Sequence, residues 1–121
     1  MITVLFIFII SLLLIHEMDA IRTKEWKMFI ILKDMPDETA YKVFSIAHLP
    51  LYFVAIMTLI QGNTPTNILY YIIDFFLVGH TMIHFLFRAK AGNGFNSVYS
   101  KIIIYSLGAL AIAHLLLIAF I

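Results

Sequence analysis

The sequence contains no cysteine and few charged residues. Of its 121 residues, 12% are Asp, Glu, Lys or Arg, whereas a soluble domain carries about 25%. The missing cysteines exclude disulfides, thiolate zinc sites, iron–sulfur clusters and cysteine nucleophiles. Eight Lys and Arg against seven Asp and Glu leave no basic excess, which excludes a nucleic-acid-binding module. So few polar groups cannot cover the surface of a soluble domain of this length.

What the sequence has instead is apolar side chains, which make up 63% of its residues. A helix needs about 20 apolar residues to cross a bilayer core of ~30 Å. Four segments reach or approach this length: about 1–21, 38–60, 65–87 and 97–121. The sequence shows no internal repeat. The first segment lacks the basic start and the cleavage site of a signal peptide, so we expect this helix to be retained in the mature protein. The sequence therefore predicts an all-α integral membrane protein, a four-helix transmembrane bundle forming one domain over 1–121.

The basic residues all fall on one side of this arrangement. They lie within segments 22–42 and 88–101, whereas the other side holds the two termini and the uncharged segment 61–67. The positive-inside rule then predicts cytoplasmic basic loops, with both termini outside, in a bacterial inner membrane. Within segment 22–34, Trp26 and the lysines around it favour a short interfacial helix with Trp26 at headgroup level. An ordinary aromatic-belt connector explains the pattern equally.

Ionisable side chains inside the predicted spans are costly in hydrocarbon and usually mark function. At a rise of ~1.5 Å per residue, histidines from three spans fall in one layer on the cytoplasmic side of the membrane centre. They are His16, His48, His80 and His84. His80 and His84 share a helix face, which is how one helix usually offers two imidazoles to a metal. Pro50 predicts a kink beside His48. We predict that the four histidines bind a divalent metal, zinc or iron, near the cytoplasmic face.

Two carboxylates lie beside this layer and a third lies apart from it. Asp19 shares a helix face with His16 and is predicted to be a fifth ligand or to orient that histidine by a hydrogen bond. Glu17 points about 100° away from His16 and, like Asp19, is a candidate catalytic base. Asp74 and His114 form a secondary polar pair nearer the membrane centre and the outer side. This pair either fixes helix register or contributes to the site or to a proton path.

The run from His16 to Arg22, His-Glu-Met-Asp-Ala-Ile-Arg, followed by Glu25-Trp26, resembles a signature of small uncharacterised bacterial four-span membrane proteins. His48-Leu49-Pro50-Leu51 and the pair His80-x-x-x-His84 are similar to other parts of that family. The resemblance covers most of the chain and implies that the polar residues form a set. It implies no activity.

A second resemblance concerns only the composition of the site. Intramembrane zinc hydrolases of the ceramidase and adiponectin-receptor kind combine an Asp, a Ser and three His on several spans. Here His80 and His84 resemble their histidine pair, and Asp74, Ser45 and His48 are counterparts for the other positions. Those hydrolases have seven spans, so the analogy does not extend to the fold.

Three classes of function fit these observations. A metal-dependent enzyme would act on a lipid-borne substrate: zinc would activate water for hydrolysis with Glu17 or Asp19 as base, whereas iron would oxidise a lipid or quinone. A haem-binding electron carrier would use one histidine from each of two facing helices. A cofactor-free structural or partner-binding protein would use the histidines only to hold helices together. A transporter is disfavoured, because four short spans leave room for a transport pathway only in a dimer. The candidate partners are membrane lipid, a lipid-borne substrate and a second copy of the chain in a homodimer.

Overall fold

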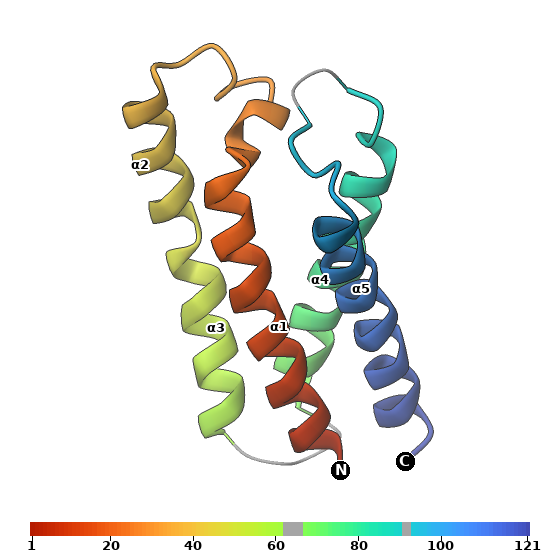
Figure 1. The fold of residues 1–121 in the computed structure, drawn as a ribbon. Helices are drawn as coiled ribbons and strands as arrows, with labels where there is room; N and C mark the ends of the chain where they lie inside the picture. Colours follow the sequence, from red (N-terminus) through yellow and green to blue (C-terminus); the bar gives the residue numbers. More distant parts are fainter. Residues whose placement is uncertain (62–66, 91–92) are drawn as a thin grey trace.

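The computed structural model describes residues 1–61, 67–90 and 93–121, and these are helical with no strand among them (Figure 1). The helices are α1 (Ile2–Arg22), η1 (Glu25–Met28, a 3₁₀ helix), α2 (Asp37–Ala47), α3 (Leu49–Ile60), α4 (Ile68–Leu86) and α5 (Val98–Ala119). The predicted all-α class is confirmed. α2 and α3 together form one apolar stretch, so four helical segments are long and apolar enough to cross a membrane. The predicted start of the third span at residue 65 lies outside the described residues.

A break at His48 divides the second of these segments. Pro50 has no N–H, so the carbonyl of Ile46 loses its usual helical partner. α2 therefore ends at Ala47 and α3 begins at Leu49, while the backbone N–H of His48 donates to the carbonyl of Ser45 at 3.2 Å. The break, where a kink was predicted, leaves the His48 side chain at the junction of two helices.

Two apolar clusters hold the helices together. The larger one joins α1, α3, α4 and α5, with Phe6, Leu13 and Leu77 fully enclosed in it. α5 approaches α4 closely at Gly108, where a Cβ atom would lie 2.7 Å from the side chain of Thr81. Close approach at a small residue is a common way for membrane helices to pack.

The smaller apolar cluster lies at the end of the molecule where the basic residues gather, and it includes Trp26, Phe44 and Phe95. Trp26 was predicted to lie at headgroup level, but its side chain turns inward. It is 4% exposed and packs edge-on or tilted against Tyr41 and Phe44, with ring centroids 6.0 and 5.6 Å away. The cluster therefore attaches η1 to α2.

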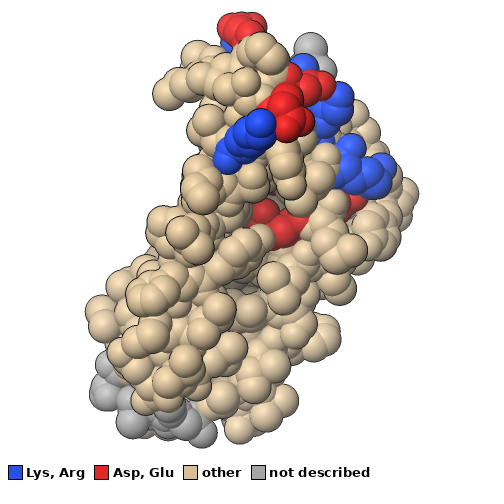
Figure 2. All heavy atoms as spheres, turned by 90° about the vertical axis from the view of Figure 1, so that its left-hand side faces the viewer, with Lys and Arg blue, Asp and Glu red and all other residues tan. Residues whose placement is uncertain are grey.

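The molecular surface separates charge from apolar side chains. Figure 2, which faces the α2 and α3 side, shows Lys and Arg atoms at one end of the molecule and mostly uncharged residues over the rest of that face. Large apolar residues point outward from the long helices, among them Phe8, Phe53, Phe75 and Ile102. Outward-facing apolar side chains along the full length of the helices are what a lipid environment requires. Figure 2 also shows acidic atoms at the bottom of a hollow between residues that carry no charge colour.

Candidate metal centre

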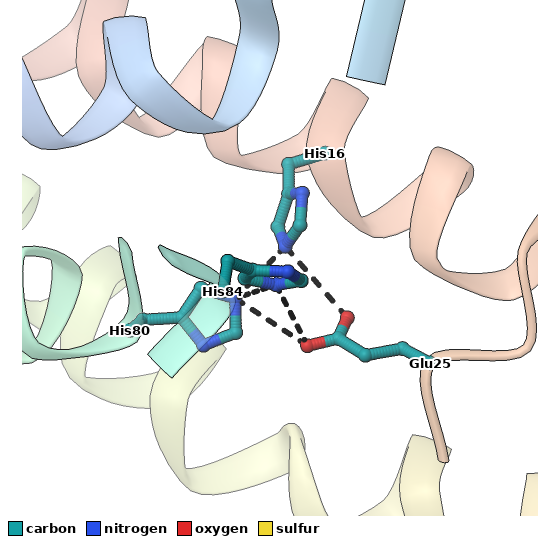
Figure 3. Close-up of side chains that lie close together, drawn as sticks. All are labelled: His16, Glu25, His80 and His84. Atoms are coloured by element: carbon teal, nitrogen blue, oxygen red, sulfur yellow. Dashed lines mark hydrogen bonds and ion pairs between the residues drawn. The ribbon is translucent and has the colours of Figure 1, made fainter. Parts of the chain in front are cut away.

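A sharp turn after α1 brings Glu25 back under the helix end. Thr23 ends α1, and its hydroxyl donates to the carbonyl of Asp19 at 2.8 Å. Lys24 then adopts the left-handed conformation, with φ of 52°, which is uncommon for a residue with a side chain. The chain reverses there, and η1 begins with Glu25 pointing into the space between α1 and α4 (Figure 3).

The turn is held in place by Asp37, the first residue of α2. Its carboxylate accepts from the Lys24 ammonium at 2.5 Å and from the Lys27 ammonium at 3.0 Å. The indole N–H of Trp26 donates to the same carboxylate at 3.4 Å. These contacts come from three residues of the η1 region and fix the segment that carries Glu25.

Four side chains converge beneath this turn: His16 from α1, Glu25 from η1, and His80 and His84 from α4 (Figure 3). One potential ligand atom from each of them lies within 4.8 Å of the others. Nε2 of His80 is 2.8 Å from Nε2 of His16 and 3.2 Å from Nε2 of His84. The Glu25 carboxylate is 3.2 Å from His84, 3.5 Å from His80 and 3.7 Å from His16.

These separations match the size of a metal coordination shell. Zinc binds imidazole nitrogen and carboxylate oxygen at about 2.0–2.2 Å, which puts neighbouring ligand atoms of a tetrahedron about 3.4 Å apart. The observed separations of 2.8 to 3.7 Å lie on both sides of that value. The donor set of three imidazoles and one carboxylate is also one that zinc and iron accept.

The electrostatics of the cluster favour a cation at its centre. A neutral imidazole carries one N–H, so three Nε2 atoms and a carboxylate facing one another cannot all be paired as donor and acceptor. Oε2 of Glu25 is buried without a hydrogen-bond partner among the described residues. Burial raises the pKa of the Glu25 carboxyl, but the hydrogen bond from His84 and the nearby His80 and His16 outweigh it, so the pKa lies below its usual range. The group is therefore a carboxylate, the form that binds metals.

The cluster is closed on one side and open on the other. Phe95 packs its ring against His84 and His16, with centroids 4.5 and 5.6 Å away, and excludes solvent from the α5 side. The His80 side chain keeps 11% of its surface exposed, whereas that of Glu25 keeps 2%. Both side chains line a cavity of about 370 Å³ that lies between η1, α2, α3 and α4. A ligand can therefore approach the centre from this side.

The structure places the other predicted site residues outside this group. His48 lines the cavity, and its Nδ1 donates to the carbonyl of Phe44 at 2.6 Å while its Nε2 is 3.2 Å from Glu17. Asp19 accepts from Arg22 at 2.6 Å through one oxygen and from the hydroxyl of Ser100 at 2.6 Å through the other. Glu17 and His48 thus form a pair beside the centre, while Asp19 joins α1 to α5.

Asp74 and His114 form a separate buried contact toward the other end of the helices. Nδ1 of His114 lies 2.6 Å from Oδ2 of Asp74, and both side chains are fully enclosed. The ring of His114 also packs against Tyr70 and Phe6, with centroids 5.1 and 5.4 Å away. Ser45, the counterpart of the hydrolase serine, donates to the carbonyl of Tyr41 at 2.6 Å on an exposed face.

Glu25 was not among the residues singled out as ligands. It follows the end of α1 by three residues, so helical periodicity says nothing about its direction. Two signals were available: its place directly after a helix that carries His16, and its inclusion, as Glu25-Trp26, in the signature that the sequence resembles. Its position depends on the turn at Lys24 and on contacts with Asp37.

Comparison with known proteins identifies the family of the chain. No curated protein and no solved structure matches it significantly. Residues 2–120 match the profile of a family described as a family of unknown function, DUF6713. The match covers nearly the whole chain, and the protein therefore belongs to the family DUF6713, whose function is unknown.

Proposed function

We propose that this protein is an integral membrane metalloenzyme whose centre, formed by His16, Glu25, His80 and His84, binds one zinc ion and hydrolyses an acyl linkage of a lipid. The observation that carries the proposal is the convergence of four metal-binding side chains within 4.8 Å in a buried position. All four are groups that zinc accepts as ligands, and the buried Glu25 carboxylate has one oxygen without a hydrogen-bond partner among the described residues.

A membrane location follows from the four apolar helical segments and their outward-facing apolar side chains. The basic residues at one end support an orientation with that end in the cytoplasm and both termini outside, in a bacterial inner membrane. In this orientation the metal centre lies near the cytoplasmic surface.

The depth of the centre favours acyl-linkage chemistry. His84 lies two residues before the end of α4 and His16 six residues before the end of α1. These positions are about 3 and 9 Å from the charged end of the helices. Lipid ester and amide groups lie where the hydrocarbon meets the headgroups, near that depth. A substrate carbonyl at this level would reach the centre without leaving the bilayer.

The reaction would use the pair beside the centre as its proton acceptor. A zinc ion held by His16, Glu25, His80 and His84 would lower the pKa of a bound water to about 7 and polarise a carbonyl group. The water oxygen forms a bond to the acyl carbon, the bond from that carbon to the leaving oxygen or nitrogen breaks, and the water proton passes to the leaving group. We assign the transfer of that proton to Glu17, whose carboxylate is 3.2 Å from Nε2 of His48, a residue that lines the cavity.

Haem binding fits this geometry less well. A bis-histidine haem needs its two axial nitrogens on opposite faces of a flat macrocycle. Nε2 of His16 and Nε2 of His80 are 2.8 Å apart and face each other directly. This arrangement suits a single ion.

The test is a metal analysis of the purified protein without a histidine tag. In mild detergent we expect about one zinc per chain and no Soret absorption. His84→Ala should lose the metal, while His114→Ala, which changes an equally buried histidine outside the centre, should retain it. Equal metal content in the two variants, or a wild-type protein that is free of metal and stays folded with chelator, would refute the proposal.

A further inference from the structure

The cavity beside the metal centre is a groove with mainly apolar walls and a few polar side chains, which we call the polar patch. It passes between the segment after η1, the α2–α3 junction and α4. Apolar side chains make up most of its lining, including Val43, Ala47, Leu51 and Phe76. The polar lining residues among those that the structure describes are Glu25, His48 and His80.

We infer that this groove binds the acyl chain of a lipid, with the acyl carbonyl beside His80 and Glu25 and the chain running past Leu51 and Phe76. The inference rests on the proposed function, because it assigns the substrate class of the same centre. It adds a binding site that the metal ligands alone do not define.

The chemistry of the lining points to an amphiphile. A purely apolar occupant, such as a helix face of another protein, would press hydrocarbon against the partly exposed imidazoles of His80 and His48 and offer no polar group to the centre. An acyl lipid carries one polar carbonyl at the end of an apolar chain. The helices give the lining that order, because Phe76 lies one turn from His80 on α4 and Leu51 on α3 lies one turn from His48, both further from the charged end of the molecule.

The size and the surroundings of the groove agree with this occupant. Its volume of about 370 Å³ lies at the lower end of the ~300–1,000 Å³ range of small-molecule sites. A second apolar hollow of about 490 Å³ adjoins it at Phe29, Leu32 and Val43. Ile30 and Ile31 line that hollow and are 75% and 78% exposed, as residues in contact with lipid would be. A lipid chain can therefore enter from the bilayer without crossing water.

The experiment uses a palmitic acid analogue with a photoreactive diazirine in the distal half of its chain. The full-length protein in nanodiscs is labelled at increasing probe concentration, with excess unlabelled palmitate as competitor, and the labelled peptides are identified by mass spectrometry. We expect competable labelling of the α3 and α4 segments that contain Leu51 and Phe76.

Two variants narrow the groove and two matched variants leave it open. Ala47 and Val43 line the groove and are exposed, so Ala47→Trp and Val43→Trp fill it without disturbing the core. Ala113 and Val98 are exposed positions on α5, and Ala113→Trp and Val98→Trp are their controls. Loss of contact with as few as two methylene groups weakens binding about tenfold. We expect at least that loss of competable labelling in the groove variants only.

The outcomes separate this inference from the proposed function. Metal content is measured in every variant as the check on folding. Loss of labelling in both groove variants with metal retained supports the inference. Equal labelling in groove variants and controls overturns it and leaves the metal centre standing. Groove-specific labelling in a protein that binds no metal supports the lipid site and refutes the proposed enzyme.

Discussion

Glu25→Gln is the substitution that tests the metal centre most directly. The glutamine keeps the size and shape of the side chain but removes the negative charge that faces His16, His80 and His84. In the metal-free protein this change should cost little, because it also removes a buried charge from a site with 2% exposure. In the metal-bound protein it removes a ligand.

The size of the effect follows from the linkage between binding and stability. A metal present at 100 times its Kd stabilises the folded protein by about 2.7 kcal/mol. Loss of groups that only support a ligand weakens metal binding about 10- to 100-fold, so loss of a ligand itself should reach at least the upper value. A 100-fold weaker Kd at the same zinc concentration leaves a stabilisation of only ~0.4 kcal/mol. Glu25→Gln should therefore lose most of the zinc-dependent increase in melting temperature.

The assay is thermal unfolding in detergent, with and without added zinc, together with the metal content of each sample. Two carboxylate variants serve as controls. Asp19→Asn breaks the contacts with Arg22 and Ser100, so it should lower the melting temperature in both conditions and keep the zinc-dependent increase. Glu38→Gln changes a side chain that is 76% exposed and should behave like the wild type. A full zinc-dependent increase in Glu25→Gln, or its loss in Asp19→Asn, would refute the assignment of Glu25 as a ligand.

Four further substitutions test other parts of the structure. His48→Ala should retain zinc, because His48 contacts Glu17 and lies outside the cluster; metal loss would contradict this placement. Asp37→Asn should weaken zinc binding about tenfold in a calorimetric titration, since it loosens the segment that carries Glu25; unchanged affinity would speak against that role. Asp74→Ala should lower the free energy of unfolding by about 1–3 kcal/mol with metal content unchanged, since it leaves His114 unpaired. Gly108→Ala should cost about 1–3 kcal/mol, as the new methyl group meets α4, and an unchanged melting temperature would refute that close approach.

The fold could be read from the sequence because hydrophobic length is a direct requirement of the membrane. Each long apolar segment is helical where the structure describes it, and the second is divided into α2 and α3 at His48. The depth of His16, His80 and His84 was predictable for a related reason. A regular helix fixes both the rise and the direction of a side chain, so residues on different helices can be compared by their distance from the helix ends.

The remaining features of the centre depend on departures from regular helix. His48 sits where Pro50 interrupts the second span, so the face on which its side chain lies does not follow from a continuous helical phase. Glu25 reaches the centre through a left-handed residue and a contact made with α2, and neither is visible in local spacing. Asp19 has Arg22 one turn later, a pairing that the sequence does display and that competes with metal binding.

Burial alone does not distinguish the two polar groups inside this protein. Asp74 and His114 are as enclosed as His16 and Glu25. The difference lies in the chemistry of the atoms that meet. Asp74 presents an acceptor to a ring nitrogen of His114 that can donate, so one hydrogen bond links the two helices, while Oδ1 of Asp74 and Nε2 of His114 are buried without a hydrogen-bond partner among the described residues. In the other group one potential ligand atom from each of three imidazoles and a carboxylate converges within 4.8 Å. A neutral imidazole supplies one N–H at most, so hydrogen bonds cannot pair all of these atoms at one point, whereas a metal ion can be bound by all four.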